Sequence, residues 1–185
     1  IKKVDLELKD LINSGIKGLT PYEPGKPIED LEREYGIKNA IKLASNESPL
    51  GPSPKVLEVL KEVISGIHRY PDGNGSRLKE ALSTRHSVST DMLTLGNGSN
   101  DIIELVARCF LTPNDNAVYS KHAFAVYPLV TQSLGAQGVE VEAKDWGHDL
   151  QAMLDAINDK TKVVFIANPN NPTGTFLEKN EIIRF

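Results

Sequence analysis

The sequence predicts a three-layer α/β/α fold with a mainly parallel sheet. From residue 92 onward, short apolar runs alternate with segments in which apolar residues recur at helical spacing. Several of the runs are followed by loops rich in glycine or asparagine. Val163–Ala167 is a run of five apolar residues, which is typical of a parallel strand covered on both faces. We therefore expect one sheet with helices on its two sides.

The first half of the chain contains fewer strand signals and more breaks. Residues 1–14 predict a short amphipathic helix, and the glycines and prolines between residues 15 and 27 predict an arm. Ile41–Ala44 resembles a short strand. The pair Ser53-Pro54 predicts the start of a helix that ends near Gly66. A second helix is expected to begin with Ser76 as its cap.

The second half supplies the expected sheet. Four runs predict its strands: Met92–Leu95, Ala117–Ser120, Gly138–Glu142 near an edge, and Lys162–Ala167. Helices are expected after Gly98, before Gly135, over Asp149–Ile157 and from Glu178 onward. Cys109 is expected on the buried face of the helix after Gly98.

The composition is that of an ordinary globular domain. The chain has 185 residues, enough for one domain with a core, and a formal net charge of −4, which argues against nucleic acid as the main partner. It contains no run of about 18 apolar residues, so no membrane partner is expected. The single Cys109 excludes an internal disulfide and a cysteine-cluster metal site. These observations together indicate the cytoplasm.

Two loops carry residues suited to ligand binding. Asn168–Gly174 follows the strand that ends at Ala167, and its asparagines offer both donors and acceptors on a backbone stiffened by proline. Gly96–Asp101 is a glycine-rich turn that leads into a helix, where backbone N–H groups favour a phosphate. In the alternative interpretation, Ser99 or Asn100 is only a helix cap and Asp101 satisfies the helix dipole without any phosphate.

The loop sequence Asn-Pro-Asn-Asn-Pro-Thr-Gly at 168–174 resembles the signature loop of the fold-type I pyridoxal-phosphate aminotransferases, and within them the histidinol-phosphate aminotransferases. The resemblance extends from Leu19 to the end of the chain. It includes Leu-Thr-Pro-Tyr at 19–22, Arg-Tyr-Pro at 69–71 and Gly-Asn-Gly-Ser-Asn-Asp at 96–101, where the family usually has Asp-Glu as the last pair. Ser48 also stands where the family has asparagine.

The resemblance implies how the domains are divided. Residues 1–45 are expected to form an N-terminal arm with a contribution to a small domain. Residues 46–185 are expected to form the N-terminal part of the large, pyridoxal-phosphate-binding domain, which is incomplete in this chain.

The resemblance also implies a cofactor, pyridoxal 5′-phosphate, and residues to hold it. The backbone amides of Ser99 and Asn100 are expected at the phosphate, Phe124 stacked on the pyridine ring, and Asn171 at the phenolic oxygen. Tyr70 is expected to reach the cofactor phosphate of a partner subunit, so the functional unit would be a homodimer. Each aromatic also has a plain alternative, since a lone phenylalanine or turn tyrosine most often only packs.

Two further residues are expected on the substrate side. The resemblance places Tyr22 near the substrate phosphate and Asn46 facing the substrate. A loop-pinning role for Tyr22 and a solvated loop around Asn46 are the alternatives.

The implied reaction transfers an amino group between histidinol phosphate and 2-oxoglutarate in histidine biosynthesis. Members of the family are roughly twice as long, and the resemblance places the lysine that binds the cofactor beyond Phe185, so no catalytic residue is expected in this chain. Two alternatives stay open. One is a related enzyme, either an aromatic aminotransferase or a phosphothreonine decarboxylase. The other is a fragment without catalytic activity.

Overall fold

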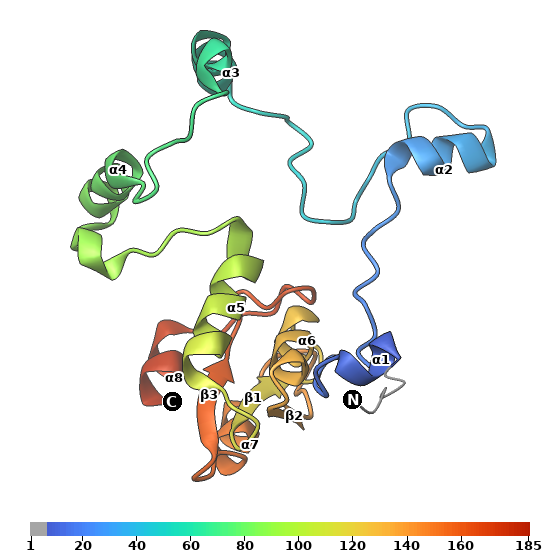
Figure 1. Ribbon diagram of the computed structural model, residues 1–185, viewed down its shortest axis with the longest axis vertical. Helices are drawn as coiled ribbons and strands as arrows, with labels where there is room; N and C mark the ends of the chain where they lie inside the picture. Colours follow the sequence, from blue (N-terminus) through green and yellow to red (C-terminus); the bar gives the residue numbers. More distant parts are fainter. Residues whose placement is uncertain (1–6) are drawn as a thin grey trace, which may run out of the picture. The chain divides into compact units, whose positions relative to one another are not determined.

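The computed structural model describes residues 7–185, which divide into two units (Figure 1). The sheet unit comprises the described residues up to Tyr22 together with Gly96–Phe185. The helical unit is Glu23–Leu95. The predicted domain division at residues 45 and 46 stays a prediction.

The sheet unit is built on three parallel strands in the order β2-β1-β3. They are β1 (Asn116–Ser120), β2 (Gln137–Val141) and β3 (Thr161–Phe165). In the central strand, Val118 pairs with Val139 on one side and Val164 on the other. The strands predicted at Ala117–Ser120, Gly138–Glu142 and Lys162–Ala167 are confirmed as β1, β2 and β3. The predicted edge position of β2 is also confirmed within the described sheet.

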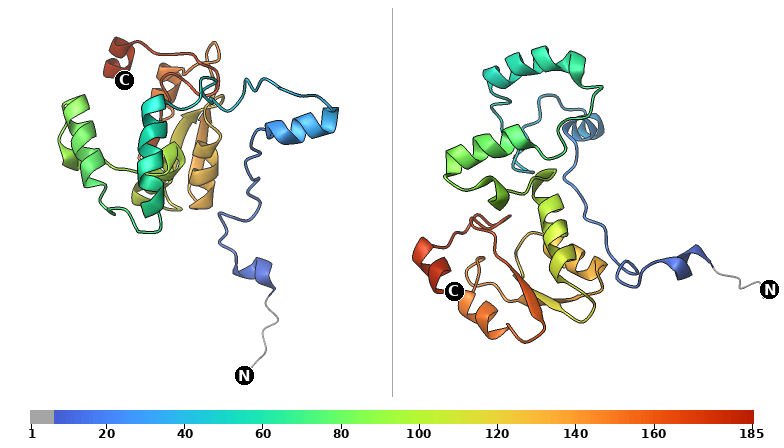
Figure 2. Two further views of the ribbon diagram at one scale, coloured as in Figure 1. Left: turned by 90° about the horizontal axis from the view of Figure 1, so that it is seen from above. Right: turned by 60° about the vertical axis from the view of Figure 1, so that its left-hand side comes forward.

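Helices cover both faces of this sheet, as Figure 2 shows. Helices α5 (Gly98–Phe110) and α6 (Val126–Ser133) pack on the face that carries Tyr119 and Phe165. On the face that carries Val118 lie α7 (Leu150–Asp155) and Phe185, which follows α8 (Lys179–Arg184). Neighbouring strand residues point to opposite faces, so Tyr119 and Val118 of β1 lie on different sides of the sheet. Each of them packs in an apolar cluster. The predicted three-layer arrangement is confirmed in this unit.

Two packing features hold the layers together. Met153 of α7 and Val118 of β1 are both 0% exposed, and burial of each stabilises the fold by about 1.5–3 kcal/mol. On the opposite face the rings of Tyr127 and Phe165 stack with centroids 4.5 Å apart. Burial raises the pKa of the Tyr127 hydroxyl, because the charged form loses its hydration.

The described start of the chain packs on α6. Only Leu8–Leu11 (α1) is helical there, and Val4, which was part of the predicted helix, lies outside the described residues. Gly15 is buried, and a Cβ at this position would collide with the backbone oxygens of Gln132 and Ser133 at the end of α6. The absence of a side chain therefore lets the arm approach α6 closely.

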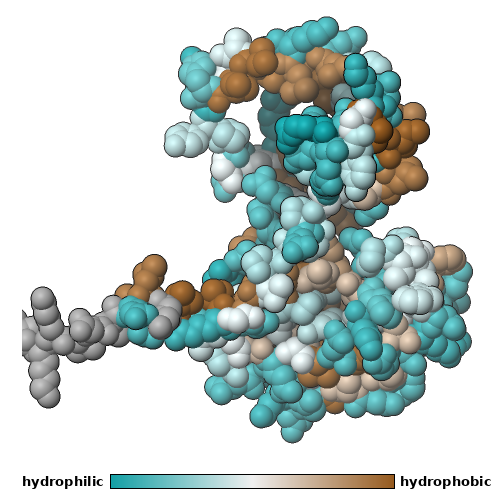
Figure 3. All heavy atoms as spheres, turned by 90° about the vertical axis from the view of Figure 1, so that its right-hand side faces the viewer, coloured by the Kyte–Doolittle hydropathy of each residue, from teal (hydrophilic) through white to brown (hydrophobic). Residues whose placement is uncertain are grey.

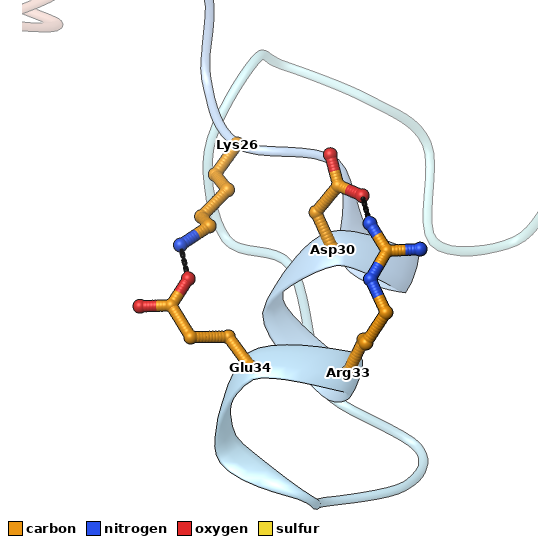
Figure 4. Close-up of polar contacts among 4 residues, drawn as sticks. All are labelled: Lys26, Asp30, Arg33 and Glu34. Atoms are coloured by element: carbon orange, nitrogen blue, oxygen red, sulfur yellow. Dashed lines mark hydrogen bonds and ion pairs between the residues drawn. The ribbon is translucent and has the colours of Figure 1, made fainter.

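The helical unit contains α2 (Ile28–Tyr35), α3 (Pro54–Val63), η1 (Ile64–Gly66), α4 (Ser76–His86) and η2 (Thr90–Met92). The prediction of a helix that ends near Gly66 is confirmed. None of its residues is buried, and hydrophobic side chains are visible on the surface in Figure 3. The ion pairs Lys26–Glu34 and Arg33–Asp30 join exposed side chains at α2 (Figure 4), so each contributes at most about 1 kcal/mol.

Two predicted strands are absent from the structure. Ile41–Ala44 has no regular structure. Met92 is the last residue of the short helix η2, and the residues that follow it up to Leu95 join no sheet among the described residues. An extended segment becomes a strand only when a neighbour accepts and donates its backbone hydrogen bonds. Neither segment has such a neighbour among the described residues.

Two smaller predictions are also wrong. Ser76 is the first residue of α4 rather than its cap: Gly75 holds the cap position with φ +61°, and the Asp72 carboxylate accepts a hydrogen bond of 2.8 Å from the Ser76 N–H. Cys109 is exposed and not part of the core. Cys109 lies two residues from each of the nearest buried residues, Ala107 and Leu111, and this spacing places it on a different side of the helix.

Candidate functional site

The N-terminus of α5 is available to an anion. The Asp101 carboxylate accepts a hydrogen bond of 2.8 Å from the Asn97 N–H, outside the helix. For the N–H groups of Ser99 and Asn100, the described part of the chain shows no acceptor, and both residues are exposed. Gly98 has φ +77°, a conformation that glycine adopts at little cost. Asp101 therefore leaves the donors that a phosphate requires, whereas neither Ser99 nor Asn100 is the cap residue, which is Asn97.

Phe124 lies in the loop between β1 and α6 and is half-buried. Its ring meets the ring of Tyr127 edge to face, with centroids 6.0 Å apart and planes at 90°. Tyr127 is itself stacked on Phe165 in the core. The Phe124 ring is thus anchored on one side while part of its surface remains accessible.

The three asparagines after β3 have different surroundings. Asn168 is exposed and closes the loop on itself, accepting a hydrogen bond from the Leu177 N–H (2.7 Å) and donating one to the Leu177 carbonyl (3.0 Å). Asn171 is half-buried, and its side chain has no hydrogen-bond partner in the described structure. The amide of Asn171 is therefore free to bind a ligand, and its role at a cofactor stays a prediction.

Asn170 is the buried member of the three, with 3% of its surface exposed. Its Nδ2 donates to the His122 carbonyl (2.9 Å) and to Thr173 Oγ1 (2.7 Å). Its backbone N–H donates to the Thr175 carbonyl (2.7 Å), and its own carbonyl accepts from the Gly174 N–H (2.8 Å). Asn170 thus ties the loop after β3 to the loop after β1.

These features gather at one end of the sheet. The loops of Phe124 and Asn171 follow the carboxyl ends of β1 and β3, which are parallel neighbours. Helix α5 leads into β1 through a short connection, so its N-terminus returns to the same end (Figure 1). In open α/β sheets this end is where ligands bind.

The remaining predicted residues are less constrained. Tyr22 is 56% exposed at the end of the arm. Asn46 and Tyr70 belong to the helical unit, where Asn46 is exposed in a turn with φ +53° and the Tyr70 ring is fully exposed. Among residues 7–185, no contact of these three residues gives them a role.

Sequence reasoning missed a third loop, which follows β2. His148 is buried, and its Nε2 lies 2.9 Å from the Ala167 carbonyl at the start of the asparagine loop. The Trp146 ring lies against the His122 ring, with centroids 4.8 Å apart. The sequence Asp-Trp-Gly-His at 145–148 predicts only a turn, so it does not indicate these contacts.

Three buried side-chain atoms have no hydrogen-bond partner in the described residues: Ser120 Oγ, His148 Nδ1 and Asn170 Oδ1. All three lie at or after the carboxyl ends of the strands. Buried polar atoms are nearly always paired, so this end of the sheet is suited to a further polar ligand or to water.

Two kinds of feature are absent from the described residues, a membrane-spanning helix and a cluster of metal ligands. No helix within residues 7–185 combines the length and the apolar character needed to span a membrane. Over the same residues, no three His, Cys, Asp or Glu side chains are grouped in a way that could hold a metal ion.

Known proteins resemble the chain closely. It matches the aminotransferase class I and II family over residues 38–184. It is 58% identical over 177 residues to histidinol-phosphate aminotransferase 2 of Pseudomonas fluorescens, covering 95% of this chain and 48% of the relative. It is 54% identical over 186 residues to histidinol-phosphate aminotransferase 2 of Methylococcus capsulatus, covering 97% and 50%. The chain thus spans about half the length of the curated relatives that it matches.

A solved structure shows the same fold. The histidinol-phosphate aminotransferase of Sinorhizobium meliloti, crystallised with pyridoxal 5′-phosphate, superposes with a TM-score of 0.82 and 26% identity. The match covers 92% of this chain and 45% of that one, which confirms the predicted fold class. The family match extends over most of the sequence. This chain belongs to the aminotransferase class I and II family.

Proposed function

We propose that the protein to which this chain belongs is a pyridoxal-phosphate-dependent aminotransferase that acts on histidinol phosphate and 2-oxoglutarate. The relatives that support this proposal are named histidinol-phosphate aminotransferases and are more than 50% identical to the chain. The structural observation that carries it is the gathering of three cofactor-suited features at one end of the sheet. They are the free amides at the start of α5, the accessible Phe124 ring and the unpartnered Asn171 amide.

The residues present fit part of the cofactor. The N–H groups of Ser99 and Asn100 would bind the phosphate, which the α5 dipole also favours. Phe124 would stack on the ring, and Asn171 would donate a hydrogen bond to the phenolic oxygen and hold it in its charged form. When bound, pyridoxal phosphate supplies an electron sink for bonds at the substrate's α-carbon.

Other parts of the proposal rest on the family resemblance. Residues 46–185 would form the N-terminal part of the large domain, with residues 1–45 as the arm and a contribution to a small domain. Tyr22 would face the substrate phosphate, Asn46 the substrate, and Tyr70 the cofactor phosphate of the second subunit in a homodimer. The cofactor-binding lysine would follow Phe185, and the enzyme would work in the cytoplasm.

The test uses the full-length protein and the 185-residue chain side by side. With pyridoxal phosphate, the full-length protein is expected to show the visible absorbance of a bound cofactor and to transfer the amino group of histidinol phosphate to 2-oxoglutarate. The shorter chain is expected to lack this activity.

Two outcomes would favour the alternatives. Faster turnover of phenylalanine or tyrosine, or release of carbon dioxide from phosphothreonine, would indicate a related enzyme. A native protein that has only these 185 residues, as judged by its intact mass, would indicate a fragment without activity.

A further inference from the structure

We propose that Asn170 is a positioning residue that sets the distance between the ring-stacking Phe124 and the hydrogen-bond donor Asn171. The inference rests on the proposed function, because it concerns the slot in which the cofactor ring would lie. Asn170 itself touches neither the ring nor the substrate in this scheme. It acts through the two loops that it joins.

The contacts of Asn170 link the two loops directly. A carboxamide nitrogen has two hydrogens to donate, and Asn170 uses one for each loop. The bond to the His122 carbonyl reaches the backbone two residues before Phe124. The bond to Thr173 Oγ1 stays within the loop that carries Asn171. Fixing both loops by one planar group leaves little freedom in their separation.

Burial makes this link costly to lose. Asn170 is 3% exposed, so water cannot easily replace a missing hydrogen bond. Loss of the Nδ2 group would leave the His122 carbonyl without this donor. The side-chain oxygen of Asn170 has no partner in the described structure and, as an acceptor, it cannot replace the donor that the His122 carbonyl would lose.

The third loop supports the same link. Thr175 Oγ1 lies 3.1 Å from Thr173 Oγ1 and 3.4 Å from the Trp146 carbonyl, to which it donates. Trp146 in turn lies against the His122 ring. The contacts of Asn170 are therefore part of a closed path through the loops after β1, β2 and β3.

Asn168 provides a matched control. It stands two residues earlier in the same loop and has the same side chain, but it is exposed and, within the described part of the chain, its side chain bonds only to Leu177. Replacing either asparagine with aspartate keeps the side-chain shape and removes the N–H donors. Only the change at residue 170 would break a link between loops.

The experiment compares Asn170→Asp, Asn168→Asp and wild type in the full-length protein, with pyridoxal phosphate as the probe. We expect Asn170→Asp to weaken cofactor binding by about tenfold or more and to change the circular dichroism of the bound cofactor. Asn168→Asp is expected to remain within about threefold of wild type. Asn170→Ser, which keeps one donor, is the second variant if the aspartate form does not fold.

Lowering the pH should restore the cofactor affinity of Asn170→Asp, whereas a general loss of packing would not be reversed in this way. A buried carboxyl beside the His122 carbonyl has a raised pKa, and once protonated it can donate one hydrogen bond again. The affinity ratio between Asn170→Asp and wild type should therefore approach one as the pH falls. Two imidazoles lie near this link, that of His122 in the loop after β1 and that of His148, whose Nε2 lies 2.9 Å from the Ala167 carbonyl, so the pH series includes wild type as its reference.

Hydrogen exchange in the absence of cofactor separates this inference from the proposed function. In cofactor-free protein, Asn170→Asp should speed exchange of the amides of residues 122–125, and Asn168→Asp should not. If wild type binds no pyridoxal phosphate, the proposed function fails, while the exchange result still decides whether Asn170 joins the loops. Equal effects of the two substitutions on affinity and exchange would overturn the inference.

Discussion

The two units have similar helical content but differ in what their helices bury. In the sheet unit, residues of α5, α6 and α7 are packed on strands, and Ala107 and Met153 are 0% exposed. In the helical unit, α3 has an apolar stripe, yet Val56, Leu60 and Val63 are each about half exposed. Amphipathic spacing therefore predicts where a helix forms, but a core requires a second surface that fits it.

The same difference separates the candidate site residues. Phe124 and Asn171 belong to the sheet unit, where packing and hydrogen bonds limit the positions of their loops. Asn46 and Tyr70 belong to the helical unit and are exposed. Their proposed roles rest on the family resemblance, whereas those of the first pair also rest on geometry.

The largest expected difference is in stability. In the 185-residue chain, Met153→Ala should lower the free energy of unfolding by about 3 kcal/mol, because it leaves a cavity between α7 and the sheet. Leu60→Ala removes the same kind of side chain from a half-exposed position and should cost less than about 1 kcal/mol. Urea unfolding followed by the fluorescence of Trp146, the single tryptophan, and by circular dichroism measures both.

Equal losses in these two variants would contradict the comparison. Repeating the pair in the full-length protein would sharpen it. A larger cost of Leu60→Ala there would show that further parts of the protein cover the apolar stripe of α3.

The next effect concerns cofactor retention. In the full-length protein, Phe124→Ala should weaken pyridoxal-phosphate binding by about tenfold, since the ring loses its stacking partner. Phe176→Ala is the control, because Phe176 is 67% exposed in the same unit and has no proposed contact with the cofactor. Affinity is measured by titration of the cofactor-free protein, and an unchanged affinity of Phe124→Ala would remove that residue from the site.

Sequence patterns predicted the sheet unit more accurately than the helical unit. Strands β1 and β3 were predictable because their apolar runs are packed between helices on both faces, and the edge strand β2 because Val139 and Val141 alternate with polar residues. Met92–Leu95 has a similar run but no neighbouring strand among the described residues, and a run alone does not reveal whether a neighbour exists. Strand formation is decided by tertiary pairing, which local sequence does not contain.

Within the site, residue type was predictable but residue role was not. The loop after β3 contains three asparagines that local chemistry cannot distinguish. Their hydrogen bonds in the fold distinguish them. Asn168 bonds within its own loop, Asn170 bonds to the loop after β1, and the side chain of Asn171 has no partner among the described residues. The family resemblance indicated Asn171, but the partner of Asn170 is 48 residues away in the sequence and became visible only in the fold.

A smaller effect is expected at Tyr70. Tyr70→Phe removes only a hydroxyl and should weaken cofactor binding a few-fold in a homodimer. The cross-subunit role is tested in a mixed dimer of Tyr70→Phe with a subunit that lacks the cofactor-binding lysine. If the hydroxyl acts across the interface, the one site that keeps the lysine receives an intact Tyr70 from the other subunit, so its activity should depend on that subunit's Tyr70. Equal affinity in the variant and wild type, or mixed dimers without that dependence, would contradict the cross-subunit role.

The smallest expected effect is the acid titration of one aspartate in each unit. Hydrogen bonds from the hydroxyl and the N–H of Thr112 lower the pKa of Asp115. Those from the N–H groups of Ser76 and Asn74 lower the pKa of Asp72 at the start of α4. Because each folded pKa lies below the unfolded value of about 3.9, the stabilisation is present above that pH and is lost as the pH falls through the folded pKa. Carbon-13 NMR of the carboxyl groups in the 185-residue chain should give midpoints below the ordinary value for both. An ordinary midpoint for Asp72 with a lowered one for Asp115 would mean that α4 does not keep its capped form without a core beneath it.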